Sequence, residues 1–191
     1  MRLSCFGKLP FYPDFIKING TDFNAVDQWF QKGILLLMQK LGADWAQKFS
    51  GASQYNFIFQ GDQTRNAIVG AFIPGEDKSG RRFPFSIFFE TSKIPLKKLD
   101  ESLQSMEEAF LKKTGEFFKH EWTGVGLETF NQMFHSWEGQ AASSSLLLLD
   151  EKQPLNFIWE ETLDGAHDSR KYLLVKNLED TLTPLTRVAA P

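Results

Sequence analysis

The chain has 191 residues, of which 21 are Lys or Arg and 24 are Asp or Glu, so its formal net charge is −3. This acidic balance supplies no basic face for nucleic acid, and Cys5 alone excludes an internal disulfide or a cysteine-based zinc site. Because the apolar runs are too short to cross a bilayer and no signal peptide is visible, we predict one cytoplasmic domain over residues 1–191 without membrane insertion.

The first forty residues predict a strand, a loop and a helix. Leu3 to Phe6 is a short apolar run that is typical of a strand. Pro10 and Pro13 push the residues before them towards extended geometry, so residues 8–14 are predicted to cross the surface as a loop. Apolar residues then recur every three or four positions from Asp22 to Leu41, which predicts an amphipathic helix.

Two helical turns and three strands are predicted next. Trp45 and Phe49, four positions apart, indicate the turns. Three short apolar runs bounded by Gly and Pro follow, at residues 54–60, 68–73 and 83–89. Their connections are too short to hold crossover helices, so we predict antiparallel strands. Alternation in the third strand places these large side chains on one face: Phe83, Phe85, Ile87 and Phe89.

The second half of the chain predicts further helices and later strands. Apolar stripes over residues 99–117 and 127–137 indicate two helices. Further strands are predicted at residues 145–149, 156–160 and 172–175, with a last short helix at 179–188. This order of elements predicts an α/β domain with a mixed, mainly antiparallel sheet flanked by helices, in which parallel pairs occur where long helices intervene.

Two of the predicted loops carry motifs. Gly7 to Phe15 reads GKLPFYPDF, and Pro74 to Pro84 reads PGEDKSGRRFP. In this order, about sixty residues apart, they resemble the G-K-L-P-x-x-G-D-F and P-S-x-D-x-x-G-R-x-F-P signatures of the TagF/ImpM family of type VI secretion-associated proteins. Pro13 and Gly75 depart from these signatures, since the family usually has Gly and Ser there. The resemblance is firm over residues 5–91 and weak over 92–191.

The resemblance implies a three-layer α/β/α fold and a role in bacterial type VI secretion. Proteins of the family are cytoplasmic accessory factors that repress assembly or firing after translation, in some systems through contact with a forkhead-associated scaffold protein. For this chain, the resemblance implies a non-enzymatic regulator that needs no cofactor. Its expected partner is a protein of the secretion machinery.

The remaining patterns predict no catalysis. Gly75 to Arg82 has the glycine spacing of a phosphate loop, but two arginines stand where Lys and Ser or Thr are required. No histidine has a second histidine three to five residues away, so no metal site is predicted. Cys5 lies among apolar neighbours, where a thiol normally serves packing. We therefore predict no enzyme, cofactor or metal.

The candidate site consists of charged, aromatic and glycine residues of the two motif loops: Lys8, Phe11, Tyr12, Asp14, Asp77, Gly80, Arg81 and Arg82. In one interpretation, an arginine forms a bidentate pair with Asp14 or Asp77 and closes the long loop over the sheet edge. In the other, the charged loops form the rim of a partner-binding surface around exposed Phe11 and Tyr12. Both can hold, because a loop anchored from inside is a rigid platform.

Two other functions remain open from the residues alone. In the first, Lys8, Arg81 and Arg82 hold a small anion or a nucleotide in a binding or enzymatic α/β domain. In the second, the chain is a structural subunit of a larger complex, which requires a large exposed apolar surface.

Overall fold

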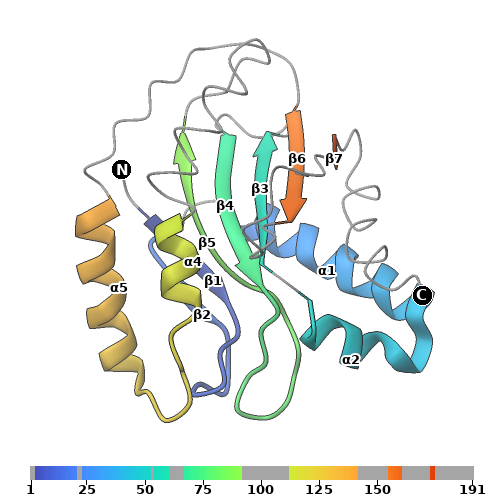
Figure 1. The fold of residues 1–191 in the computed structure, drawn as a ribbon, viewed down its shortest axis with the longest axis horizontal. Helices are drawn as coiled ribbons and strands as arrows, with labels where there is room; N and C mark the ends of the chain where they lie inside the picture. The colour runs from blue at the N-terminus through green and yellow to red at the C-terminus, as the bar shows by residue number, and fades with distance from the viewer. Residues whose placement is uncertain are drawn as a thin grey trace, which may run out of the picture.

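The computed structural model describes residues 3–20, 23–52, 54–60, 67–91, 112–141, 155–160 and 173–174. These residues form one sheet with helices packed on it (Figure 1). The predicted α/β class is therefore confirmed.

The described residues include seven strands, which lie in the spatial order β2-β1-β5-β4-β3-β6-β7. Their bounds are Leu3–Gly7 for β1, Ile16–Ile18 for β2, Tyr55–Gln60 for β3, Ala67–Ile73 for β4, Phe85–Thr91 for β5, Leu155–Glu160 for β6 and Leu173–Leu174 for β7. Neighbouring strands are antiparallel in each pairing. The antiparallel prediction for the central strands is confirmed. The parallel pairs expected beside long helices are absent among these strands, because β1 and β6 both run against their inner neighbours.

Helices pack on both faces of the sheet. Their bounds are Phe23–Leu41 for α1, Trp45–Ser50 for α2, Lys112–Phe118 for α4 and Leu127–Ala141 for α5, with a short 3-10 turn, η1, at Gly42–Asp44. Side chains of α1 belong to one buried cluster, and side chains of α4 and α5 belong to a separate one. The sheet therefore lies between two helical layers, and the predicted three-layer arrangement is confirmed.

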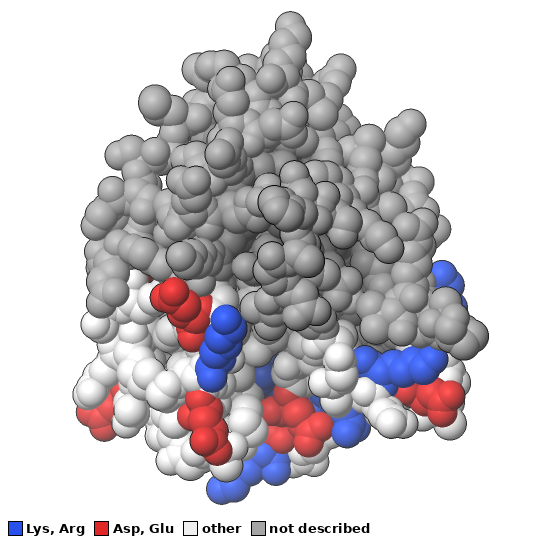
Figure 2. Space-filling model, in the orientation of Figure 1, with Lys and Arg blue, Asp and Glu red and all other residues white. Residues whose placement is uncertain are grey.

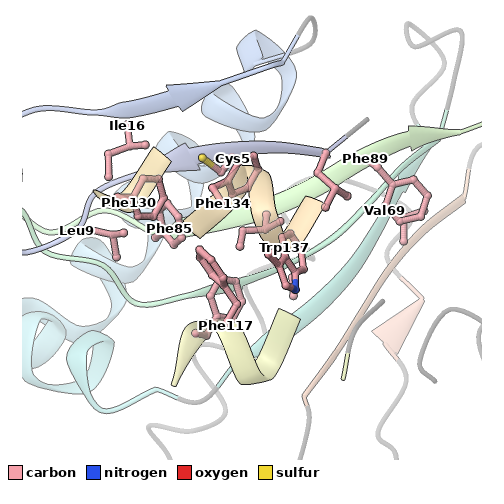
Figure 3. Close-up of a cluster of buried hydrophobic side chains, with 14 of the residues drawn as sticks. Cys5, Leu9, Ile16, Val69, Phe85, Phe89, Phe117, Phe130, Phe134 and Trp137 are labelled. Carbon is pink, nitrogen blue, oxygen red and sulfur yellow. The ribbon is translucent and has the colours of Figure 1, made fainter. Parts of the chain in front are cut away.

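The first buried cluster joins the sheet to α4 and α5. Figure 3 shows Phe85 of β5 together with Phe117 of α4 and with Phe130 and Trp137 of α5. The rings of Phe85 and Phe130 lie 6.0 Å apart, edge to face, and those of Phe117 and Trp137 lie 5.3 Å apart. Aromatic contacts of this kind stabilise the packing of α4 and α5 on the sheet.

The second buried cluster joins the other face of the sheet to α1. Phe88 of β5 and Phe30 of α1 belong to it. Phe83 also lies here, with its ring centroid 5.8 Å from that of Phe30, and not beside Phe85 as alternation predicted. That prediction is wrong because β5 begins at Phe85, so strand alternation does not extend back through Pro84.

Some predictions differ from the structure or lie outside the described residues. Strand β2 was not predicted, because three residues are too few to show a period. The predicted elements at 145–149 and 179–188, and most of the helix at 99–117, fall outside the described residues. None of the helices that the structure describes is both long and apolar enough to cross a membrane. Strands β6 and β7, from the weakly matching half of the chain, lie in the same sheet as β1 to β5.

Candidate functional site

The two motif loops lie against each other at one end of the sheet. The first loop, residues 8–15, follows β1, and the second loop, residues 74–84, joins β4 to β5. The amide of Lys78 donates to the carbonyl oxygen of Tyr12 at 3.1 Å, and the guanidinium of Arg81 donates to the carbonyl oxygen of Pro13. Figure 1 shows both loops at the lower end of the view. The two motifs thus form one structural unit.

Asp77 is the centre of this unit. It is 2% exposed, and each carboxylate oxygen accepts two hydrogen bonds. Oδ1 accepts from the backbone amides of Ser79 at 2.9 Å and Arg81 at 3.0 Å. Oδ2 accepts from Lys8 Nζ at 2.5 Å and from Arg81 Nε at 2.7 Å. A buried carboxylate has only acceptor sites, so these four donors compensate for its removal from water.

These contacts keep Asp77 ionised. Burial by itself raises the pKa of Asp77, but the hydrogen bonds from Lys8, from the Arg81 and Ser79 amides and from the Arg81 guanidinium lower it further than burial raises it. The pKa of Asp77 therefore falls from 3.8 to about 2.

Lys8 is the buried cation of the pair. Its position directly after β1 turns the side chain inward, where it is 4% exposed. Its Nζ also lies 4.7 Å from the ring centroid of Phe15, a cation–π contact from the same loop. Two cations, Lys8 and Arg81, thus share the single negative charge of Asp77. We call these three residues the lock.

The four residues that follow Asp77 form a tight turn, which we call the crest: Lys78, Ser79, Gly80 and Arg81. The Gly80 amide donates to the Asp77 carbonyl oxygen at 2.9 Å, and the Asp77 amide donates to that of Arg81 at 3.0 Å. Gly80 has φ +79°, which explains a residue without Cβ at this position. All four crest residues are exposed.

Gly75 brings the two loops into backbone contact. A Cβ at this position would lie 2.4 Å from the carbonyl oxygen of Lys8 and 2.5 Å from that of Phe83. The family usually has Ser here, so this departure from the signature coincides with a closer approach of the two loops than a side chain would permit.

The two arginines of the motif point to different partners. Arg81 binds Asp77 through Nε and the Pro13 carbonyl through Nη2, so one of the predicted pairs forms, but its side chain does not bind the carboxylate in the bidentate way that was predicted. Arg82 binds Glu76 at 3.2 Å and the hydroxyl of Ser50, at the end of α2, at 3.1 Å. The predicted anion site of Lys8, Arg81 and Arg82 does not form as one cluster, because Lys8 and Arg82 neutralise different carboxylates.

Asp14 and the aromatic residues of the first loop differ from expectation. Asp14 pairs with neither arginine; its Oδ1 accepts from the following amide, that of Phe15, at 2.8 Å. Phe11 and Tyr12 were predicted to be exposed, but both are half-buried against the first cluster. The Phe11 ring lies 5.5 Å from that of Phe130 in α5, so it anchors the loop.

Glu138 of α5 was not predicted as an anchor. It accepts from the Leu3 amide at 2.8 Å and contacts His135 Nδ1 at 3.2 Å, which ties α5 to the start of β1. Its position in the last turns of an amphipathic helix gave no signal of this long-range contact.

Other reactive groups are placed in structural surroundings. Cys5 is fully buried in β1, and burial raises the pKa of its thiol. Within the described ranges, no group of three or more His, Cys, Asp or Glu side chains could hold a metal ion. Large exposed apolar side chains in these ranges occur at Leu35 and Met38 of α1 and at Leu127 of α5, so they are split between two helical layers.

Charge around the loops is mixed in sign. Figure 2 shows Lys and Arg side chains interspersed with Asp and Glu side chains over the lower part of this face, the end at which the loops lie in Figure 1. Such a surface favours pairwise contacts between charged groups over long-range attraction by one sign of charge.

The chain is similar to known proteins in its motifs and in its fold. The model of the TagF N-terminal domain, described as type VI secretion system-associated, matches residues 4–132, about two thirds of the chain. This range contains both motif loops and extends beyond residue 91 through α4 into α5. No curated protein matches the chain.

A similar fold occurs among solved structures. The crystal structure of PA0076 from Pseudomonas aeruginosa PAO1 has a TM-score of 0.52 and 17% sequence identity, over 97% of this chain and 77% of that one. At this identity the similarity concerns the fold alone.

Proposed function

The chain belongs to the TagF N-terminal domain family of type VI secretion-associated proteins, and on this premise we propose that it is a non-enzymatic accessory factor of that system. It represses assembly or firing after translation by stoichiometric binding of a cytoplasmic component. The family resemblance favours a forkhead-associated scaffold protein as this component.

The main observation in support of the proposal is that the exposed crest stands on a buried ion pair of Asp77 and Lys8, which we call the base. Asp77 and Lys8 are 2% and 4% exposed, while the side chain of Arg81, which contacts the same carboxylate, is 59% exposed. The base holds the backbone of the crest in one conformation before any partner arrives. A surface that is already ordered loses less entropy on association, so this turn is suited to binding a protein.

The charged groups of the motif are poorly suited to catalysis. A carboxylate with a pKa of about 2 that already accepts four hydrogen bonds is a weak general base at neutral pH. Lys8 is buried against this carboxylate and stays paired with it. These internal contacts support a binding role for the loops over a chemical one.

Controlled expression in a bacterium with an active type VI system tests the proposal. We expect overproduction of the chain to reduce release of a secreted type VI substrate without reducing the amounts of the machinery proteins. A Lys32→Gln variant, altered on the exposed face of α1, is the control and should repress as well as the wild type. Unchanged secretion on overproduction of the wild type would contradict the proposal.

Affinity purification from the same bacterium tests the mechanism. We expect the wild-type chain to retain one component of the machinery in a fixed ratio, and the Lys78→Gln/Arg81→Gln variant to retain much less of it. A thermal melt of each variant separates lost binding from lost folding. Equal retention by well-folded variants would show that the crest is not the binding surface.

A further inference from the structure

The three residues of the lock have a net positive charge, because Lys8 and Arg81 together carry two positive charges and Asp77 carries one negative charge. Lys8 and Arg81 both contact Oδ2 of Asp77, at 2.5 and 2.7 Å, and among the described residues no other carboxylate forms an ion pair with either of them. The Lys8 side chain is 5% exposed and cannot be reached from outside. The excess charge is therefore available at Arg81, whose side chain is 59% exposed.

The Arg81 guanidinium is held at two points and has donors left. Nε donates to Asp77, and Nη2 donates to the carbonyl oxygen of Pro13. A guanidinium has five N–H donors, so three remain without a partner among the described residues. Because the two internal contacts fix the plane of the group, little side-chain entropy is lost when these donors bind an acceptor.

The surroundings of Arg81 favour an anionic acceptor. Lys78, on the same crest, is exposed, and its side chain has no ion pair with a described residue. Glu76 is already paired with Arg82. Asp14 is the nearby exposed acid in the first loop, and it lies beyond ion-pair distance of Arg81.

We infer that the crest recognises an acidic segment of its protein partner, in which a Glu or Asp carboxylate binds the free edge of the Arg81 guanidinium and Lys78 adds a second contact. This inference rests on the proposed function and adds the chemical class of the segment that is bound. A carboxylate matches the planar fork of arginine in a bidentate contact, which is the stronger kind of charge-assisted hydrogen bond.

NMR titration of the full ¹⁵N-labelled chain with a hexaglutamate peptide tests the inference. We expect progressive shifts of the Arg81 Nε–H signal and of the Lys78 to Arg81 amides, which saturate and which weaken as salt is added. Arg81→Gln should weaken the apparent affinity by about tenfold, as expected for loss of a charge-assisted pair. Lys78→Gln should weaken it less.

Matched controls separate this contact from general attraction. Lys32→Gln removes the same charge from the exposed face of α1 and should bind as the wild type does. A hexalysine peptide should produce no shifts at the crest. The inference is overturned by the absence of shifts with hexaglutamate, by equal loss in Lys32→Gln and Arg81→Gln, or by inorganic phosphate shifting the same signals at lower concentration.

The Lys78→Gln variant keeps the test decisive if Arg81→Gln fails to fold, because the Lys78 side chain forms no hydrogen bond or ion pair with a described residue. Unchanged hexaglutamate binding in Lys78→Gln together with shifts outside the crest would also overturn the inference. The proposed function has a separate readout. Wild-type retention of a machinery component without hexaglutamate binding would refute only the acidic-segment inference, whereas absence of any retained component would refute the proposed function itself.

Discussion

Asp77 of the base and the crest that follows it are neighbours in the second loop, but they differ in physical role. Asp77 in the base has four donors and is 2% exposed, whereas Arg81, four residues later, exposes 59% of its side chain. Loss of a contact in the base leaves a charge buried without its partner. Loss of the Lys78 side chain from the crest leaves an exposed turn that water can solvate, whereas loss of Arg81 also removes one donor from Asp77. The base therefore governs folding of the two loops, and the crest is available for recognition.

Asp77→Asn should have the largest effect, because the amide leaves the buried Lys8 cation without its anion. We expect a loss of about 3–5 kcal/mol in the free energy of unfolding, the range for breaking a buried pair by removing one partner. Urea unfolding measures it. Asp14→Asn, the same change at an exposed acid that retains its Oδ1 acceptor, should be close to neutral. Similar losses in both variants would mean that the base and the surface acids do not differ.

Low pH should have the second largest effect, because protonation of Asp77 reduces the stability that its ion pair with Lys8 contributes. The pKa of Asp77 is lowered from 3.8 to about 2 in the folded chain, so the unfolded chain binds more protons between these values. The stabilisation by this carboxylate is complete above pH 4 and is lost as the pH falls towards 2. It amounts to about 2–3 kcal/mol, at roughly 1.4 kcal/mol for each pKa unit.

A titration of the Asp77 carboxyl carbon by NMR checks this value directly. We expect a midpoint near pH 2 for Asp77 in the folded chain and an ordinary midpoint for Asp77 when the chain is unfolded in urea. A folded-state midpoint near 3.8 would show that the four donors do not offset burial.

Gly80→Ala, a change within the crest, should have an intermediate effect on the free energy of unfolding. Gly80 has φ +79°, and a Cβ there would have only Glu76 Oε1 nearby, at 3.9 Å. The loss thus comes from backbone strain without a steric clash, and about 1–2 kcal/mol is expected. Gly80→Asn should lose less, since Asn tolerates the left-handed region better. Thermal unfolding of both variants tests this order, and equal losses would contradict the explanation.

Lys78→Gln should have the smallest effect on folding. Its exposed side chain forms no hydrogen bond or ion pair with a described residue, so the free energy of unfolding should change by no more than about 0.5 kcal/mol. Retention of the partner in affinity purification should nevertheless fall. A clear loss of stability in this variant would show that the crest contributes to folding as the base does, which would contradict the comparison.

The types of the elements and the central sheet could be predicted from local patterns in the sequence. Alternating or continuous apolar runs between Gly and Pro identified β1, β3, β4, β5 and β6, and a spacing of three and four residues identified α1 and α5. Such patterns are local, because the burial of one face imposes a period on a few consecutive residues. Strand β2 was not predicted, because its three residues are too few to show such a period.

Which of the motif residues serve as anchors depends on contacts between segments that are distant in the chain. Sequence placed Lys8, Asp77, Arg81 and Arg82 in two loops and allowed several pairings among them. The strand order brings the end of β1 beside the start of β5, which buries Lys8 against Asp77 and directs Arg82 towards α2 instead. Burial of a charge and choice of its partner depend on residues about seventy positions away in the chain, and no local period encodes them.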